Sequence, residues 1–122
     1  MVSEAVTPAA IKPLVTHVAF AALDIRVGTI VLVEDVPRSA KLVRLTVDLG
    51  DHRRRIIAGL KQERANPKEI EGKQSLFVVN LEPKTIMGEL SEGMLLDIGY
   101  ADGVTPCLAV PERTVPNGVR AG

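Results

Sequence analysis

The sequence predicts an all-β fold: a small barrel of five short strands, with short helices and an appended C-terminal strand. Two observations support this prediction. Apolar residues make up 46% of the 122 residues, but Phe20, Phe77 and Tyr100 are the only aromatic ones, so the core must consist mainly of Val, Ile and Leu, which favour strands. Apolar and polar residues also alternate over short stretches that turn residues separate. The length suits one domain.

The strand signals follow one another along the chain. Strands are expected at residues 24–35, 42–49, 53–60, 74–81 and 93–100, with a further one at 107–110. The residues expected to face inward on the first two strands are Ile25, Val27, Val31 and Val33, then Val43, Leu45, Val47 and Leu49. Gly28, in the middle of the first strand, indicates a bend or bulge. Gly50 and Asp51 provide a turn before the third strand.

Two short helices are expected beside these strands. Thr16 is a candidate N-cap for one or two helical turns over residues 16–23. The run NPKEIEG at residues 66–72 offers an N-cap, a proline at the first helical position, a glutamate that would complete a capping box, and a terminal glycine. A helix between the third and fourth of five strands is the layout of the oligonucleotide/oligosaccharide-binding (OB) barrel. Another small barrel or a sandwich is the alternative.

The chain divides into a tail and a domain. Residues 1–15 include Pro8 and Pro13 and show no period, so they are expected to form a flexible or loosely docked tail. Residues 16–122 then form the domain. Cys107 is the only cysteine, which excludes an internal disulfide and suits a reducing compartment. Because neither a signal peptide nor a membrane-spanning run is present, we expect a cytoplasmic chain that does not enter a membrane.

Charge is balanced overall but not along the chain. Fifteen Lys and Arg face 15 Asp and Glu, so no global positive charge indicates a nucleic-acid partner. Residues 38–64 nevertheless hold eight basic side chains against three acidic ones. The eight are Arg38, Lys41, Arg44, Arg53, Arg54, Arg55, Lys61 and Arg64. A polyanion responds to such a local block more than to the sum.

Catalytic motifs are absent from the sequence. It contains no phosphate-binding glycine loop and no nucleophile elbow, and His17 and His52 have no partner at metal-ligand spacing. Glu89 and Glu92 lie three apart in a loop-like context, where a solvated pair is the simpler interpretation than an acid/base pair. The sequence therefore predicts a protein that is not an enzyme and that needs no cofactor or metal.

Three stretches together resemble a known family. FAALDIRVGTIVLVEDVPRSAKLVRLTVDLG is similar to the opening of the tRNA-binding domain that occurs free-standing and at the C-terminus of many methionyl-tRNA synthetases. RRRIIAGL resembles that family's third strand, and NLEPKTIMGELSEGMLL resembles its N-L-x-P-[KR]…G…S-x-G-M motif. The resemblance covers about residues 18–98. It implies an OB barrel, which agrees with the strand order, and it implies tRNA binding.

The C-terminal segment resembles a second branch of this superfamily. PERTVPNGVR is similar to the end of CsaA, an export-related, chaperone-like protein with the same barrel and a dimer-forming extension. CsaA relatives usually show a serine- and lysine-rich stretch after the second strand and S-E-V in place of S-E-G-M. The resemblance implies a homodimer that forms through about residues 99–122. It also implies an alternative function, a chaperone that binds unfolded chains or preproteins; a structural assembly module in synthetase complexes is a third.

The candidate tRNA-binding residues follow from this resemblance. The family match favours Lys41, Arg44, Arg55 and Lys84 for phosphates over Arg54 and Arg64, although a charge run alone is usually a solvated face. In a strand, Arg53 and Arg55 point opposite to Arg54, so at most two of these three arginines face one ligand. The other candidates are Asn80 for a base or ribose, Ser91 for a close backbone approach, and Met94 for a base face. From residue type alone, a satisfied amide is an equally good interpretation of Asn80, and a place in the core is the commoner one for Met94.

The scarcity of aromatic residues favours one kind of RNA. OB-fold proteins that bind single strands stack bases on aromatic side chains, at roughly 1–3 kcal/mol per base. With three aromatic residues in the chain, recognition of structured tRNA by its shape and phosphates is the better fit. The expected protein is thus a non-catalytic, homodimeric tRNA-binding protein, which assists an aminoacyl-tRNA synthetase in trans as a further expectation.

Overall fold

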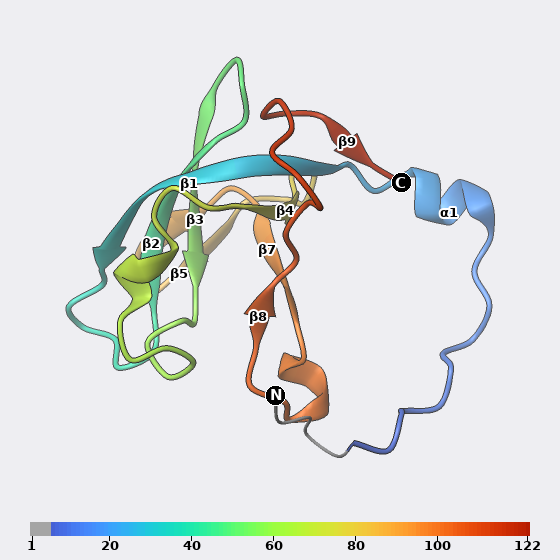
Figure 1. Ribbon diagram of the computed structural model, residues 1–122, viewed down its shortest axis with the longest axis horizontal. Coiled ribbons are helices and arrows are strands. Elements are labelled where there is room, and N and C mark those ends of the chain that lie inside the picture. Colours follow the sequence, from blue (N-terminus) through green and yellow to red (C-terminus); the bar gives the residue numbers. More distant parts are fainter. Residues whose placement is uncertain (1–5) are drawn as a thin grey trace.

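The structure, a computed structural model, describes residues 6–122 (Figure 1). The first five residues of the predicted tail lie outside the described residues. The strands are β1 (Ile25–Asp35), β2 (Val43–Asp48), β3 (Arg53–Ala58), β4 (Gln74–Val78), β5 (Lys84–Ile86), β6 (Glu89–Ser91), β7 (Met94–Ile98), β8 (Cys107–Leu108) and β9 (Arg120–Ala121). The helices are α1 (His17–Ala21) and the 3₁₀ turns η1 (Pro67–Ile70) and η2 (Tyr100–Asp102). The all-β prediction is confirmed.

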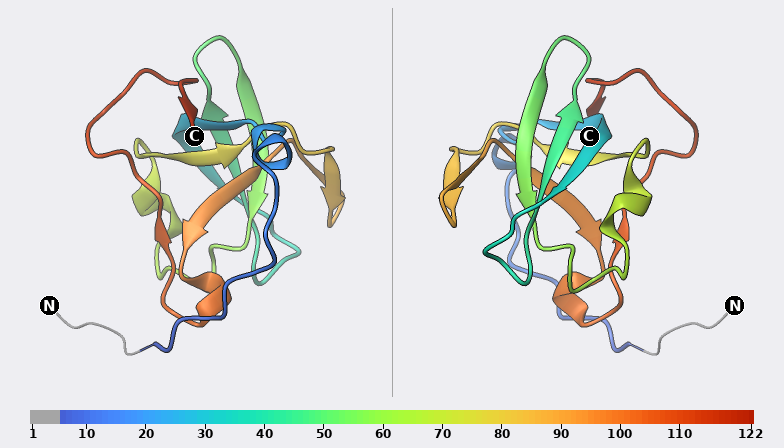
Figure 2. Two further views of the ribbon diagram at one scale, coloured as in Figure 1. Left: turned by 90° about the vertical axis from the view of Figure 1, so that its right-hand side faces the viewer. Right: turned by 90° about the vertical axis from the view of Figure 1, so that its left-hand side faces the viewer.

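One antiparallel sheet forms the body of the protein. Its strand order is β3-β2-β1-β4-β7-β8, and β9 pairs with β1 beside this path. The strands curl around a common interior, as the two side views in Figure 2 show. Strands β1, β2, β3, β4 and β7, with η1 between β3 and β4, are the five barrel strands of the predicted OB layout. Strands β5 and β6 form a separate hairpin.

The long strand β1 carries a bulge that changes which residues face inward. Its register against β2 shifts between Ile30 and Leu32. Ile30 and Val33 are therefore both buried in the core, whereas Val31 between them is only half-buried. The predicted inward position of Val31 is wrong because Val31 is the extra residue of the bulge and has no partner in the ladder with β2. The bulge lies just after Gly28, and it allows β1 to pair with β4 at one end and with β2 at the other.

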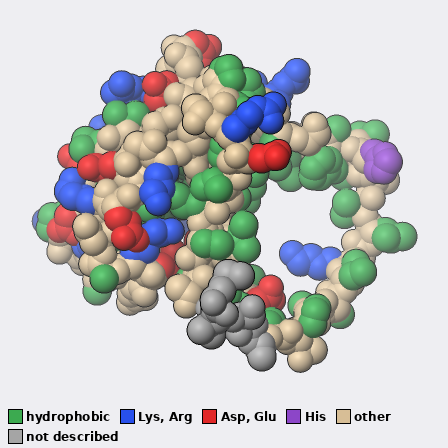
Figure 3. All heavy atoms as spheres, in the orientation of Figure 1, with side chains coloured by type: hydrophobic (Ala, Val, Ile, Leu, Met, Phe, Trp, Pro, Cys, Tyr) green, Lys and Arg blue, Asp and Glu red, His purple; other side chains and the backbone are tan. Residues whose placement is uncertain are grey.

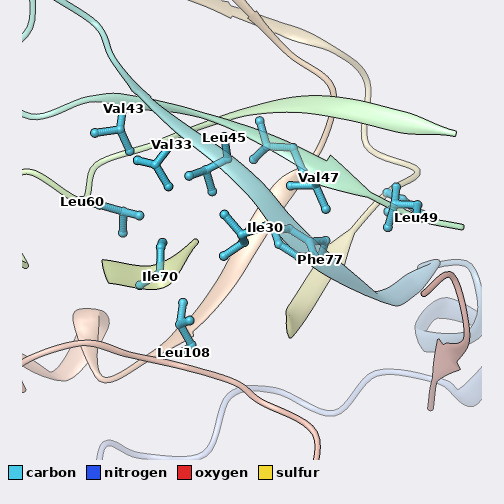
Figure 4. Packing of buried hydrophobic residues seen from close by; sticks show 12 residues of the cluster. Ile30, Val33, Val43, Leu45, Val47, Leu49, Leu60, Ile70, Phe77 and Leu108 are labelled. Atoms are coloured by element: carbon cyan, nitrogen blue, oxygen red, sulfur yellow. The ribbon is translucent and has the colours of Figure 1, made fainter. Parts of the chain in front are cut away.

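The core fills the barrel with aliphatic side chains and one aromatic ring. Figure 4 shows Ile30, Leu45 and Val47 packed around the fully buried Phe77. All four residues expected to face inward on the second strand are buried, which confirms the predicted alternation there. Leu60, Ile70 and Leu108 complete the end of the core near η1.

Local signals for turns and caps are largely confirmed. Thr16 caps α1 by accepting a hydrogen bond from the Ala19 N–H at 3.0 Å. Asn66 caps η1 by accepting from the Lys68 N–H, and Gly72 ends the turn with a φ of 87°. Glu69 does not complete the predicted capping box, because its carboxylate pairs with Arg64. The Arg64 Nη1 to Oε1 distance is 2.7 Å.

Gly28 faces the inside of the barrel, where there is no room for a side chain. A Cβ at this position would lie 2.6 Å from Val47 Cγ1 and 3.1 Å from the Asp48 carbonyl oxygen. We expect Gly28→Ala to lower the free energy of unfolding by about 1–3 kcal/mol, as overpacking does in tight cores. Urea denaturation measures this effect.

Gly59 provides a matched control for that substitution. A Cβ there would lie 2.7 Å from Lys41 Cε, the far end of a flexible side chain that is able to move. We therefore expect Gly59→Ala to change stability by less than about 0.5 kcal/mol. Equal losses for the two alanines would contradict the tight approach of β1 and β2 at Gly28.

Candidate nucleic-acid interface

The three arginines at the start of β3 point to two sides, as the strand period predicts. Arg53 and Arg55 are exposed and Arg54 is half-buried. In the ladder with β2, Arg53 lies opposite Asp48 and Arg55 lies opposite Thr46. The guanidinium groups of Arg53 and Arg55 make no ion pair among the residues the structure describes. They are therefore available to an outside ligand.

Arg54 has a structural role. Its guanidinium donates to the carbonyl oxygens of Val79 and Glu92, and its Nε donates to His52 Nε2 at 3.0 Å. His52 Nδ1 in turn lies 2.6 Å from Asp51 Oδ1, and this hydrogen bond lowers the pKa of the Asp51 carboxyl. Arg54 thereby joins β3 to the end of β4 and to the turn before β7, and its guanidinium is occupied within the chain.

The end of the β5–β6 hairpin is hydrogen-bonded to β3. The Glu92 N–H donates to the Arg55 carbonyl at 2.8 Å, and the Glu92 carboxylate accepts from the Arg55 N–H at 3.1 Å. The buried Ser91 hydroxyl accepts from the Ile57 N–H at 3.0 Å and donates to the Gly93 carbonyl at 3.1 Å. The Ser91 hydroxyl thus ties the hairpin to β3 within the chain.

The hairpin brings Lys84 to the same region as Arg55. Lys84 lies opposite Ser91 in the hairpin ladder, and Ser91 is bonded to β3. Lys84 is exposed and has no ion-pair partner within residues 6–122. We call Arg53, Arg55 and Lys84 the β3–hairpin surface. Arg53 was missing from the candidates, although the alternation that groups it with Arg55 was visible in the sequence.

Arg44 lies on the adjacent strand, but its charge is already matched. Its Nη1 is 2.7 Å from Glu89 Oε1 on β6, and its Nε is 3.3 Å from Glu34 Oε1 on β1. The hydrogen bond to Glu34 and the charges of both glutamates raise the pKa of Arg44 further above its usual value. Arg44 therefore holds the hairpin against the sheet, and its net field at an incoming phosphate is reduced.

Lys41 and Met94 lie together at a different place, a hollow of about 240 Å³ between β3 and β7. The Lys41 ammonium is 5.9 Å from the centre of the Tyr100 ring, within reach of a cation–π contact. Glu63 and Asp97 line the same hollow. Burial and the adjacent Asp97 raise the pKa of the Glu63 carboxyl. Two carboxylates beside Lys41 make this hollow a poor site for phosphate.

Asn80 is on a third part of the surface. Its Oδ1 accepts from the Asp24 N–H at 2.8 Å and its Nδ2 donates to the Ala22 carbonyl at 2.7 Å. The amide therefore clamps the junction of α1 and β1, which is the satisfied-amide interpretation. Beside this junction, a hydrogen bond from Arg26 lowers the pKa of Asp24.

The structure thus brings together only some of the predicted residues. Arg55, Lys84 and Ser91 lie around the β3–hairpin contact, and Arg44 borders them in an ion-pair network. Lys41 and Met94 share the hollow with carboxylates, and Asn80 is separate. Within residues 6–122, no three His, Cys, Asp or Glu side chains gather to hold a metal ion. No helix in the same range is long and apolar enough to span a bilayer.

Comparisons with known proteins place the chain in a family. The sequence model of the family described as "Putative tRNA binding domain" matches residues 25–120. A methionine–tRNA ligase of Methanocaldococcus jannaschii is 40% identical over 100 residues, which cover 82% of this chain and 14% of that protein. The chain therefore spans only about one-seventh of the ligase's length.

Solved structures resemble the whole domain. A MetRS related protein from Pyrococcus horikoshii superposes with a TM-score of 0.84 at 33% identity, covering 91% of this chain and 100% of that one. The chaperone CsaA from Bacillus anthracis superposes with a TM-score of 0.77 at 29% identity, covering 90% and 100%. The family match extends over most of the chain and includes β1–β8, the hairpin and the exposed cations of β3. The chain belongs to the tRNA-binding domain family.

Proposed function

We propose that this protein is a non-catalytic, homodimeric tRNA-binding protein whose β3–hairpin surface contacts the phosphates of a structured tRNA. The observation that carries the proposal is the group formed by Arg53, Arg55 and Lys84. These cations come from separate strands, are exposed, and lack carboxylate partners among the described residues. Cations that are free in the unbound protein release condensed counterions when they meet phosphate, and this supplies most of the affinity.

The remaining predicted residues contribute in other ways to this proposal. Arg44 and Ser91 fix the hairpin and so position Lys84 relative to Arg55. Met94 is 45% exposed at the mouth of the hollow and offers an apolar contact to a base beside the phosphates. Lys41 borders this contact. Asn80 keeps one amide N–H that its two internal bonds do not use, which is available to a ribose or base.

The positions of the aromatic side chains favour structured RNA over a flexible single strand as the ligand. Phe77 is fully buried, so the ring cannot stack on a base. Phe20 and Tyr100 are exposed but lie on different elements, α1 and η2. A row of stacking platforms, which single-strand binding requires, is therefore absent from residues 6–122. Backbone contacts to a preformed RNA surface need no such row.

Titration of total tRNA at several salt concentrations tests the proposal. Binding that involves the three cations of the β3–hairpin surface is expected to show a slope of log K against log salt of roughly −2 to −3. Filter binding at salt concentrations from about 0.05 M to about 0.2 M measures this slope. Affinity that does not change with salt, or an absence of binding, would contradict the proposal.

A chaperone function is the second candidate, and exposed apolar residues favour it. The CsaA structures resemble this fold, and Ile11, Leu14 and Val18 are 81–97% exposed. A chaperone that holds unfolded chains needs such apolar surface in place of a basic one. A competition experiment tests whether the two functions use one site. If the sites are separate, unlabelled tRNA displaces labelled tRNA from the protein but does not displace a bound unfolded polypeptide.

A synthetase is the proposed protein partner. In the Methanocaldococcus jannaschii relative, the matching segment is part of a methionine–tRNA ligase. A tRNA-binding barrel that acts in trans raises the local concentration of tRNA near such an enzyme, and two barrels in one dimer increase this effect. The dimer is proposed on the resemblance of residues 111–120 to the CsaA extension.

A further inference from the structure

The turn of the β5–β6 hairpin places a methionine in a backbone conformation that suits glycine. Met87 has a φ of 52° and is the only non-glycine residue with a positive φ within residues 6–122. Gly88, with a φ of 78°, completes a two-residue turn between Ile86 and Glu89, which lie opposite each other in the ladder. Glycine or asparagine adopts this conformation easily, whereas a longer side chain is strained in it. Strain of this kind is concentrated at functional sites, so Met87 is a candidate functional residue.

Met87 is exposed at the tip of a hairpin that projects from the barrel. Its exposed fraction is 57%, and a Cβ added at the adjacent Gly88 would meet nothing within 4 Å. Figure 2 shows the hairpin, drawn in gold, standing out from the side of the sheet. More than half of the Met87 surface is therefore free for contact with another molecule.

The base of this hairpin is fixed to the barrel. The Ser91 hydroxyl accepts from the Ile57 N–H at 3.0 Å, and Glu89 Oε1 lies 2.7 Å from the Arg44 Nη1. Ser91 and Glu89 are both on β6, the strand that follows the turn. Because the tip is held in this way, it has little conformational freedom to lose on binding, and an apolar contact at Met87 converts efficiently into affinity.

The charges around the hairpin indicate RNA as the ligand at its tip. Lys84 is on the same hairpin as Met87, and it belongs to the β3–hairpin surface, whose cations have no ion-pair partner among the described residues. Figure 3 views the barrel from the side opposite the hairpin, where basic and acidic side chains are intermixed. Three residues separate Lys84 from Met87, roughly 10 Å along a strand. An RNA strand whose phosphate contacts Lys84 therefore reaches the tip within a few bases.

We propose that Met87 is an apolar wedge that packs against the face of an accessible base in the bound tRNA, while the β3–hairpin surface holds the nearby phosphates. The inference rests on the proposed function and deepens it, because the wedge recognises a feature that phosphates do not provide. Apolar side chains, methionine among them, insert between base steps in proteins that bind nucleic acids. The flexible thioether side chain adapts to different base faces. The wedge thus selects folded RNA with an accessible base over a continuous duplex.

Replacing Met87 by asparagine separates binding from folding. Asparagine relieves the backbone strain, so we expect Met87→Asn to unfold at a urea concentration no lower than that of the wild type. We expect this variant to bind total tRNA about tenfold more weakly, in the lower part of the range that base stacking contributes. No cation is lost, so the slope of log K against log salt is expected to stay within about half a unit of the wild type. Filter binding over a salt series measures both quantities.

Leu90 provides the matched control on the same hairpin. It is 47% exposed on β6 and has Thr85 as its ladder partner. Because side chains alternate along a strand, Leu90 points to the face opposite that of Ser91, which is bonded to β3. We expect Leu90→Asn to change tRNA affinity by less than about twofold. Equal losses in Leu90→Asn and Met87→Asn would show a general effect of apolar surface and would overturn the wedge.

The absence of tryptophan from the sequence allows an optical test. We expect Met87→Trp to bind tRNA at least as tightly as the wild type, because an indole ring stacks well on a base. The addition of tRNA is expected to quench the indole fluorescence of this variant and to shield it from acrylamide, and to leave Leu90→Trp unchanged. If an unfolded polypeptide shields the indole of Met87→Trp and tRNA does not, the wedge is wrong and the tip serves the chaperone function.

These measurements separate a failure of the wedge from a failure of the proposed function. If the wild-type chain binds tRNA with the expected salt dependence and Met87→Asn binds it equally tightly, the wedge is wrong and tRNA binding stands. If the wild-type chain binds no tRNA, both the proposed function and the wedge are wrong.

Discussion

Replacing Arg55 and Lys84 together by glutamine is expected to weaken tRNA binding by roughly 100-fold at 0.1 M salt. Each cation that meets a phosphate contributes about one unit to the slope of log K against log salt, so their loss makes the slope shallower by about two. The wild type and the double variant are taken to bind tRNA equally at about 1 M salt, where the electrostatic contribution vanishes. A slope difference of about two then corresponds to a roughly 100-fold difference in affinity at 0.1 M salt. Filter binding over a salt series measures both quantities.

A charge-matched variant controls for the change in net charge. Lys73 and Arg113 are exposed, have no ion-pair partner within the described residues, and border the same shallow hollow on another part of the barrel. Lys73→Gln/Arg113→Gln removes the same two charges, and we expect its salt slope to stay within about half a unit of the wild type. If both double variants lose affinity equally, tRNA is bound by the general field and the β3–hairpin surface has no special role.

Replacing Arg54 by methionine is expected to lower the free energy of unfolding by about 2–3 kcal/mol. The substitution removes a charged donor from the Val79 and Glu92 carbonyls, and hydrogen bonds of this kind contribute about 1.5–3 kcal/mol each. Water reaches the half-buried site and offsets part of the loss. Methionine keeps the aliphatic length of the side chain, so packing changes little. Chemical denaturation measures the difference.

The adjacent arginine is the control for this prediction. Arg53 is on the same strand and exposed, and its guanidinium has no partner in residues 6–122. Arg53→Met is therefore expected to change stability by less than about 0.5 kcal/mol and to weaken tRNA binding instead. The Arg54→Met variant thus reports on stability, and the Arg53→Met variant reports on tRNA binding. Similar losses of stability in both variants would show that Arg54 does not hold the seam between β3 and the turn before β7.

The sequence predicts the fold well where one face of a strand is buried. The alternation from Val43 to Leu49 follows the strand period without interruption, and all its inward residues are buried. The same argument fails at Val31: Gly28 indicates a bend or bulge in this strand, but which residue is the extra one depends on the pairing with β2. The β5–β6 hairpin was also missed. Its turn uses Met87, with a φ of 52°, before Gly88, where asparagine or aspartate would have indicated a two-residue turn.

The candidate site is less accessible to sequence reasoning than the fold. Residue type and strand period were enough to separate Arg55 from Arg54. Arg44, however, is neutralised by Glu34 and by Glu89, which lies 45 positions away, and only the folded register brings these three together. The amide of Asn80 likewise binds backbone groups 56 and 58 positions earlier. Whether a polar side chain is free depends on such distant partners, and a single sequence does not contain them.

The partners of β1 have a consequence for how the chain acquires its shape during synthesis. β1 pairs with β2 close by, with β4 about fifty residues later, and with β9, where Ile25 lies opposite Ala121. A chain emerging from the ribosome therefore presents an incomplete β1 until almost all of the domain has been made, and closure of such distant pairings is slow. During this interval the unpaired edge of β1 is able to pair with another chain and aggregate. Pairing of β9 with β1 covers this edge and ends that risk.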